Sequence, residues 1–240
     1  MKKFSLLNVG YLFAVICLFF YSFTQVDLSL TLSQISIWQV FEKFFQHIGY
    51  FQRPLSTWLF VGIIISLFAF YLLILNQAHK KKISRESIWF LIIATTLILA
   101  FSYNAFSYDL FNYIFDAKIV TNYHLNPYVH KALDFPGDPM LSFMHTTHRP
   151  YPYGPVWVLL TAPLSFLGFG FFLPTFLLFK AFIGASFFGS VYFLEKILKQ
   201  VKTQDSLFAL TLFALNPLVI IESLVSGQND IVLMLFAILS

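Results

Sequence analysis

One short run in the sequence places two carboxylates and a phenol where they could act together. In the run SYDLFNYIFD, residues 107–116, Asp109, Tyr113 and Asp116 stand at positions i, i+4 and i+7. If the run is helical, these three side chains share one face of the helix. A carboxylate within hydrogen-bond reach of a hydroxyl can then remove its proton as a general base. The alternative is that Asp109, just behind a capping Ser107, only satisfies the positive end of the helix dipole.

The region around this run, residues 104–154, carries much of the titratable chemistry of the chain. Side chains there that could bind a phosphate are Arg149, His148, His145 and Lys131. Arg149 is the first choice, because a guanidinium offers two parallel donors to phosphate oxygens. A metal site is the alternative for His145 and His148, which stand at i and i+3. We expect no metal and no cofactor, because the sequence has neither an HExxH motif nor a cysteine pair.

The composition requires that membrane helices position these residues. Of the 240 residues, 58% are hydrophobic and 11% are charged, and the mean hydropathy is +0.76. Soluble domains carry about 25% charged residues, so most of this surface must face lipid. We therefore predict an all-α polytopic membrane protein. The single cysteine, Cys17, excludes a disulfide within one chain.

The apolar runs and the lysines beside them predict the path across the membrane. The expected crossings are residues 9–23, 58–75, 88–103, 175–194 and 207–221, with a last run that begins at Ile231. The pI of about 9.1 could indicate nucleic-acid binding. The basic residues instead lie in short loops beside apolar runs, so the positive-inside rule explains them better and we expect no nucleic-acid partner.

The orientation follows from two basic clusters, Lys2 with Lys3 and the lysines of residues 80–82. Both indicate the cytoplasm. After three crossings, residues 104–154 would form a large extracytoplasmic active-site loop carrying short helices. We expect residues 1–240 to be a single plasma-membrane domain and the N-terminal part of a longer chain, because the last apolar run is too short to span.

Two segments leave alternatives open. Apolar residues recur at helical spacing in residues 33–53, which predicts an amphipathic helix in the membrane surface anchored by Trp38, with a short solvent loop as the alternative. Residues 156–173 either cross the membrane or form a short, broken or re-entrant segment. The second arrangement is favoured, because it places Lys196, Lys199 and Lys202 in the cytoplasm.

Further short motifs follow along the chain. An Asn-Pro-Tyr stands at residues 126–128, a Tyr-Gly-Pro at 153–155, an Asn-Pro-Leu at 216–218 and a Gly-Gln-Asn-Asp at 227–230. With the run at 107–116, these motifs in this order resemble the integral-membrane glycosyltransferases of the GT-C superfamily. Within it, the sequence is similar to the bacterial polyprenol-phosphate-mannose-dependent mannosyltransferases. The resemblance covers roughly half the chain.

The resemblance implies a GT-C-like bundle of transmembrane helices that transfers a sugar, mannose, from a polyprenyl-phosphate-linked donor to an extracytoplasmic glycan or lipid acceptor. The expected partners are this lipid-linked sugar donor, the glycan or lipid acceptor and membrane lipid. By position, the resemblance implies that Asp109 is catalytic. The residues it implies for substrate binding are Tyr113, Asp116, Asn126, Tyr128, Arg149, Tyr153, Asn229 and Asp230.

The sequence departs from the family pattern at three positions. Asn112 stands where the family often has Arg, Ala117 where it often has Gly, and Gln228 where His is usual. The missing Arg and His weaken any phosphate contact or proton transfer through positions 112 and 228.

Two other classes of protein are the alternatives. A transporter or flippase subunit would use Lys180, Glu222 and Asp230 as polar groups on a substrate path through the membrane. Such proteins often have repeated halves, whereas this chain has no visible repeat and gathers its polar residues in one loop. A non-catalytic membrane partner that kept the scaffold is the third hypothesis.

Overall fold

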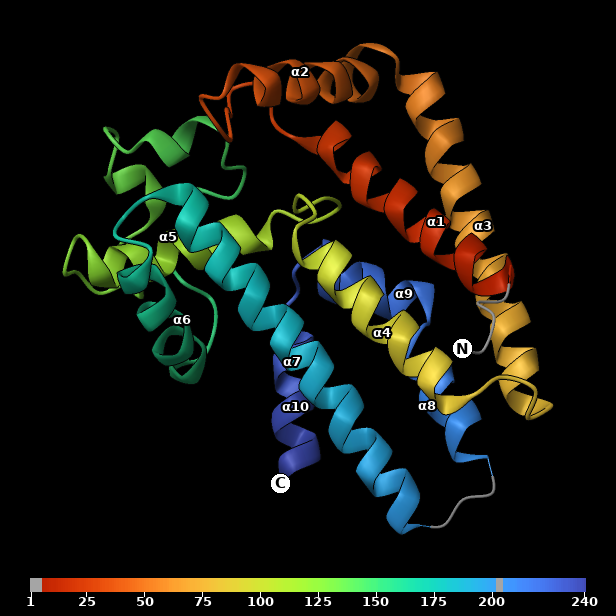
Figure 1. The fold of residues 1–240 in the computed structure, drawn as a ribbon. Helices are drawn as coiled ribbons and strands as arrows, with labels where there is room; N and C mark the ends of the chain where they lie inside the picture. Colours follow the sequence, from red (N-terminus) through yellow and green to blue (C-terminus); the bar gives the residue numbers. More distant parts are fainter. Residues whose placement is uncertain (1–5, 202–204) are drawn as a thin grey trace.

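The structure is a computed structural model that describes residues 6–201 and 205–240. Lys2, Lys3 and Lys202 lie outside the described residues. The regular elements in the described part are helical, with no strand, which confirms the predicted all-α class (Figure 1). The α-helices are α1 (Leu6–Ser22), α2 (Ser36–Phe51), α3 (Arg53–His79), α4 (Arg85–Ala100), α5 (Asp109–Thr121), α6 (Pro155–Leu167), α7 (Phe172–Gln200), α8 (Ser206–Ala214), α9 (Pro217–Ile220) and α10 (Asp230–Leu239).

Three helical segments are long and apolar enough to cross a membrane, which confirms a membrane protein. They are Leu6–Gln25 with 20 residues, Arg53–His79 with 27 and Phe172–Gln200 with 29. At about 1.5 Å per residue, each covers a hydrocarbon core of roughly 30 Å. α8 and the segment Pro217–Val225 qualify together as a fourth span, bent by 45° at the break between them.

α4 is the third crossing expected from the sequence, and it is shorter than the other candidates. It has 16 residues, or about 24 Å of helix. It packs against α1 and α7 within the bundle (Figure 1). The crossing of α4, and with it the exact number of passes, therefore stays a prediction.

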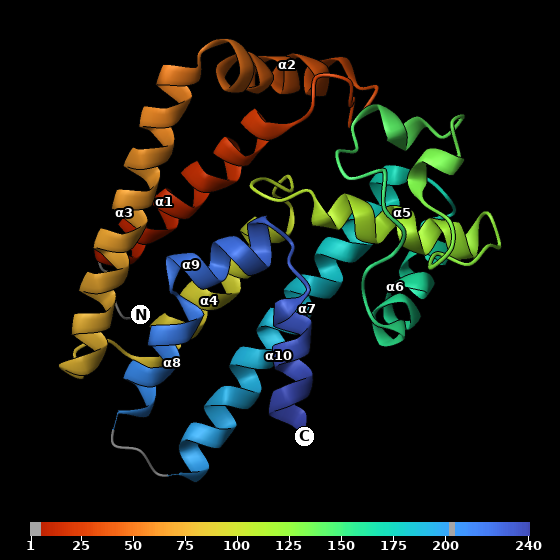
Figure 2. The ribbon, with the colours of Figure 1, turned by 180° about the vertical axis from the view of Figure 1, so that it is seen from behind.

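α2 lies across the ends of α1 and α3, at the opposite end of the bundle from the C-terminal ends of α3 and α7 (Figures 1 and 2). The predicted helix within residues 33–53 is confirmed. Its polar face points inward, because Glu42 Oε2 accepts hydrogen bonds from the N–H of Leu32 at 3.2 Å and from Trp38 Nε1 at 3.1 Å. The indole of Trp38 also packs edge-on against Phe23, so its partners are within the protein.

α6 leads back to α7 through a tight turn. It has 13 residues, or about 20 Å of helix, which is too short for a span. Its end is joined to the end of α5 by a hydrogen bond between Ser165 and Thr121. The turn that follows uses left-handed backbone at Phe169 (φ +54°) and Gly170 (φ +75°). Between residues 155 and 200, only α7 is therefore long enough to cross, as the favoured arrangement requires.

The segment between α4 and α6 is folded around α5. Every residue of α5 from Leu110 to Ala117 is buried, because α6, α7 and the rest of the loop cover the helix. Lys118 Nζ lies 2.5 Å from Asp138 Oδ2, and the Tyr123 hydroxyl donates to the same oxygen at 2.6 Å. Burial alone would raise the pKa of Asp138, but the hydrogen bonds from Lys118, Tyr123 and a backbone N–H lower it below its ordinary value. These contacts tie the end of α5 to the segment that carries Asp138.

Candidate active site

The predicted helix over residues 107–116 exists, and Asp109 is its first residue. Ser107 Oγ accepts the backbone N–H of Asp109 at 3.2 Å, so the hydroxyl serves the exposed N–H groups of the helix start. Asn104 Nδ2 donates to the Ser107 carbonyl at 2.8 Å and holds this turn from below the helix. The Asp109 carboxylate itself makes no described hydrogen bond to a backbone N–H. It lies near the positive helix end, where the N-cap residue, Tyr108, makes no side-chain cap hydrogen bond either.

Gln228 is the nearest described polar partner of that carboxylate. Its Nε2 lies 2.8 Å from Ser107 Oγ and 3.4 Å from Asp109 Oδ2. The turn that delivers it has left-handed backbone at Gly227 (φ +67°), where a Cβ would stand 2.6 Å from Asn104 Oδ1. Sequence reasoning treated Gln228 only as a departure from the family pattern. The signal for its role was the Gly-Gln-Asn-Asp motif, but nothing in the sequence shows which residue it meets.

Tyr113 lies one helical turn further on, as the i, i+4 spacing predicted. Its ring packs edge-on against Tyr153 with centroids 5.0 Å apart, and against Trp157 at 5.1 Å. Burial, the neighbouring Tyr153 hydroxyl and the charge of Asp109 all raise the pKa of Tyr113, while the backbone N–H of Asn229 acts against them. Tyr113 is therefore a neutral hydroxyl that joins the Asp109 turn to Tyr153 and Asn229.

A groove of about 300 Å³ opens beside this cluster, between α6 and α10. Its polar end is formed by three residues that the sequence predicted for substrate binding, Tyr153, Asn229 and Asp230. The rest of its lining is mostly apolar: Gly154, Val156, Trp157, Leu160, Val232, Leu233 and Phe236. We call this feature the α6–α10 groove. A recess with a polar end and apolar walls suits a ligand that has a polar head and an apolar tail.

Asp116 faces a different and much smaller space. Asp116 is 9% exposed and shares a small pocket of about 10 Å³, room for one water molecule, with Asn112 and Arg149. Burial raises the pKa of Asp116 to about 7, although the charge of Arg149 acts in the opposite direction. The Asn112 Nδ2 atom has no hydrogen-bond partner within the described residues. Asp116 and Arg149 therefore form a second cluster, and neither residue lines the α6–α10 groove.

Comparison with known proteins bears on the classes left open by the sequence. The alpha-(1→6)-mannopyranosyltransferase, N-terminal domain family matches residues 10–240. The chain belongs to this family. No curated protein and no solved structure matches it. Membership confirms the resemblance to GT-C mannosyltransferases, supports a glycosyltransferase that handles mannose, and favours an enzyme over the transporter hypothesis.

In this chain, Asn126 and Tyr128 support the groove rather than line it. Asn126 Oδ1 accepts the backbone N–H of Tyr128 at 2.9 Å, and the Pro127 carbonyl accepts the N–H of Tyr151 at 3.0 Å. The rings continue the contact, with Tyr128 on Tyr151 at 5.1 Å and Tyr151 on Tyr153 at 5.5 Å. The Asn-Pro-Tyr motif thus braces the segment that carries Tyr153.

The other predicted phosphate contacts are distributed around the loop. His145 packs on the ring of Tyr108 with centroids 3.8 Å apart, and its Nε2 lies 3.7 Å from Asp27 Oδ2. His148 and Arg149 are exposed. Lys131 stands next to the short turn Ala132–Asp134. Within the described residues, no group of three or more His, Cys, Asp or Glu side chains could hold a metal ion.

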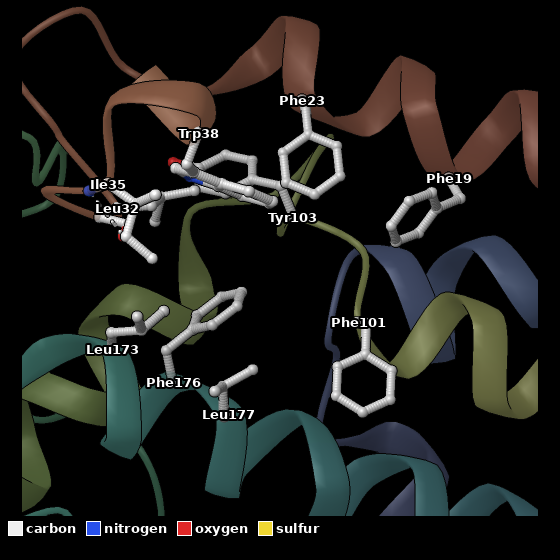
Figure 3. A pocket seen from close by; sticks show the side chains of 11 residues that line it. Phe19, Phe23, Leu32, Ile35, Trp38, Phe101, Tyr103, Leu173, Phe176 and Leu177 are labelled. Atoms are coloured by element: carbon white, nitrogen blue, oxygen red, sulfur yellow. Dashed lines mark hydrogen bonds between the residues drawn. The ribbon is translucent and has the colours of Figure 1, made fainter. Parts of the chain in front are cut away.

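A larger recess lies on the other side of the bundle (Figure 3). It has a volume of about 380 Å³ and is formed by α1 and the turn after it, the start of α2 with the segment before it, the residues that follow α4, and α7. Its lining is almost wholly apolar: Phe19, Phe23, Leu32, Ser33, Ile35, Trp38, Phe101, Tyr103, Leu173, Phe176 and Leu177. We call it the α1–α7 recess. It carries no carboxylate and no cation, so it has no group that could take part in sugar transfer.

Proposed function

We propose that the protein transfers mannose from a polyprenyl-phosphate-linked donor to a hydroxyl group of an extracytoplasmic glycan or lipid acceptor. One observation carries this proposal. A carboxylate without a cationic partner in the described part, Asp109, stands with Gln228 beside the polar end of the α6–α10 groove. The groove then continues between apolar helix surfaces. A sugar at the polar end and an isoprenoid chain between the helices would match this division.

Asp109 would act as the general base. The acceptor hydroxyl attacks the anomeric carbon of the donor sugar and gives its proton to the Asp109 carboxylate. The new bond joins the acceptor oxygen to the sugar, and the bond from the sugar to the phosphate oxygen breaks. The polyprenyl phosphate leaves with the electron pair of that bond. Gln228 Nε2, 3.4 Å from Asp109 Oδ2, would orient the carboxylate without neutralising it.

Arg149 is the proposed contact for the departing phosphate. Its positive charge acts to lower the pKa of Tyr153, at the polar end of the groove, and the pKa of Asp116. It is exposed, so its guanidinium has donors to spare for an anion, in the paired geometry that phosphate oxygens accept. Tyr153, Asn229 and Asp230 would then contact the sugar hydroxyls.

The apolar groove favours a lipid-linked donor over a nucleotide-linked one. A nucleotide sugar carries a base, a ribose and two phosphates, which would require polar and cationic walls. The walls of the α6–α10 groove below Tyr153 are instead the side chains of Trp157, Leu160, Val232 and Phe236, among others. An isoprenoid chain buries apolar surface there at roughly 25 cal/mol per Å².

The proposed orientation places the site outside the cytoplasm. Lys80, Lys81 and Lys82 follow the end of α3, and Lys199 lies in the last turn of α7. Both helix ends lie at the end of the bundle that is away from α2 (Figures 1 and 2). The positive-inside rule then supports a cytoplasmic position for that end of the bundle, and an extracytoplasmic one for Asp109.

The direct test replaces Asp109 with Asn and measures mannose transfer by the purified protein in nanodiscs. Polyprenyl-phosphate mannose is the donor, and a nucleotide-linked mannose is supplied in parallel. Asn keeps the size and can still accept a hydrogen bond from Gln228, but it is not a base, so we expect transfer to fall about 10²–10⁴-fold. The matched control is Asp134→Asn, an exposed carboxylate of the same loop, which should transfer normally.

Two results would count against the proposal. Near-normal transfer by a well-folded Asp109→Asn protein would remove the base. Transfer from the nucleotide-linked sugar alone would replace the lipid-linked donor. Because the Asp109 carboxylate caps no backbone N–H, its substitution loses only the helix-dipole term, about 0.3–1 kcal/mol, so the variant should fold.

A further inference from the structure

A lysine in the middle of the bundle has no part in the chemistry described so far. Lys180, on α7, is 1% exposed. Its Nζ donates to Ser102 Oγ at 3.1 Å, to the Leu224 carbonyl, and to the Val225 carbonyl at 3.4 Å. None of the described salt bridges includes Lys180. Three acceptor oxygens match the three donors of an ammonium group, so the side chain is saturated within the protein and does not line a described pocket.

The carbonyls that Lys180 binds belong to the end of a helix. The segment Ile221–Val225 is a π-helical turn that continues α9. The last carbonyls of a helix have no partner within it and carry the negative end of its dipole. A cation is stabilised there, as lysines near helix C-termini generally are. Lys180 therefore fixes the place where the broken helix stops.

Ser102 links the same lysine to the exit of α4. The Ser102 hydroxyl donates to the Leu99 carbonyl at 2.7 Å, so its lone pair is free to accept from Lys180. Two segments far apart in the sequence, the exit of α4 and the end of the π-helical turn, are thus held to one nitrogen atom.

Both segments lead directly into the candidate active site. From Ser102 the chain reaches Asn104, whose amide holds the Ser107 carbonyl at 2.8 Å and so the start of α5. From Val225 the chain reaches Gln228, whose amide lies 2.8 Å from Ser107 Oγ and 3.4 Å from Asp109 Oδ2. Lys180 is the common anchor behind both partners of this contact.

We infer that Lys180 is a positioning residue for sugar transfer. By joining the residues after α4 to the end of the π-helical turn, it fixes the position of the Asp109 carboxylate relative to the Gln228 amide. The inference rests on the proposed function of Asp109. Its effect should appear in the chemical step, because a misplacement of about 1 Å in a reacting group can cost about 10²-fold in rate. Donor binding in the α6–α10 groove should change little.

The kinetic test compares Lys180→Met with Lys196→Met. Met keeps the length of the side chain but donates no hydrogen bond. Lys196 is on the same helix but exposed, with its Nζ over the ring of Tyr192. We expect kcat for Lys180→Met to fall about 10- to 100-fold, with the donor KM within about 3-fold of the wild-type value. The Lys196→Met enzyme should match wild type. Equal kcat in the two variants would overturn the inference.

A second measurement needs no activity and so separates this inference from the proposed function. Cysteines replace Ser107 and Gln228 in a Cys17→Ser background, and a short bifunctional thiol reagent joins them. We expect the cross-linking yield to fall at least about 3-fold when Lys180→Met is added, and to stay constant with Lys196→Met. An unchanged yield would overturn the inference, even if Asp109→Asn is inactive. If Lys180→Met fails to fold, Ser102→Ala takes its place and should lower the yield; a yield equal to that of the parent would again overturn it.

Discussion

The buried carboxyl of Asp116 makes the stability of the active-site loop depend on pH. Burial raises its pKa from 3.8 to about 7, so the native state holds this proton more tightly than the unfolded chain does. Between about pH 4 and pH 7, the native state therefore carries one proton more than the unfolded state, and stability falls as pH rises through this window. Above pH 7 the full cost of a buried charge is present.

The size of this effect follows from the shift. A change of about 3 pKa units, at 1.36 kcal/mol each, corresponds to about 4 kcal/mol. Asn has nearly the same shape and takes up no charge. We therefore expect Asp116→Asn to be about as stable as wild type near pH 4, and more stable by up to ~4 kcal/mol at pH 8. At about 2 °C per kcal/mol for a chain of this size, the Tm would rise by roughly 8 °C.

The assay is thermal unfolding of the purified protein in detergent, followed by intrinsic fluorescence between pH 4 and pH 8. Asp134→Asn is the matched control: it removes an exposed carboxylate of the same loop, keeps an oxygen that can accept the Lys131 N–H, and loses only a surface pair with His130, so it should stay within about 1 kcal/mol of wild type at both pH values. A gain in Tm for Asp116→Asn that is equal at pH 4 and pH 8 would refute the reasoning, as would a loss at pH 8. An unchanged acceptor KM and kcat would also remove Asp116 from the residues proposed to bind substrate.

Three further predictions concern the groove, the turn and the orientation. Leu160→Trp should fill the α6–α10 groove and raise the donor KM about 10-fold or more. Leu177→Trp, in the α1–α7 recess, should leave the donor KM unchanged. The reverse result would show that the lipid chain of the donor binds in the recess. Gly227→Ala should lower the free energy of unfolding by about 1–2 kcal/mol, because it places a Cβ on left-handed backbone and against Asn104. It should also lower the rate of mannose transfer at least about 10-fold. Full activity would show that the turn tolerates the change. A cysteine at Asp134 should react with a membrane-impermeant thiol reagent in intact cells, and labelling only after lysis would reverse the proposed orientation.

The helices could be read from the sequence because apolar runs and lysine clusters report directly on the membrane. The face of α5 could be read as well, since the spacing of Asp109 and Tyr113 is a local property of a helix. The contacts of Gln228 and Lys180 could not be read, because they join residues 119 and 44 positions apart. The sequence predicted Trp38 as an anchor at the membrane surface, which stays a prediction; its indole bond to Glu42 could not be read, because that contact depends on how α2 packs against the segment before it.

The motifs meet because of the path that the chain takes between them. α7 carries the chain away from the loop that holds Asp109, and α8 with α9 brings it back (Figure 2). One outgoing and one returning passage place the Gly-Gln-Asn-Asp turn beside α5 again, where Gln228 touches Asp109. A second full crossing before α7 would have put the turn on the other side of the membrane. The short α6 fits this predicted path: its 13 residues are too few for a span, and its side chains supply one wall of the groove.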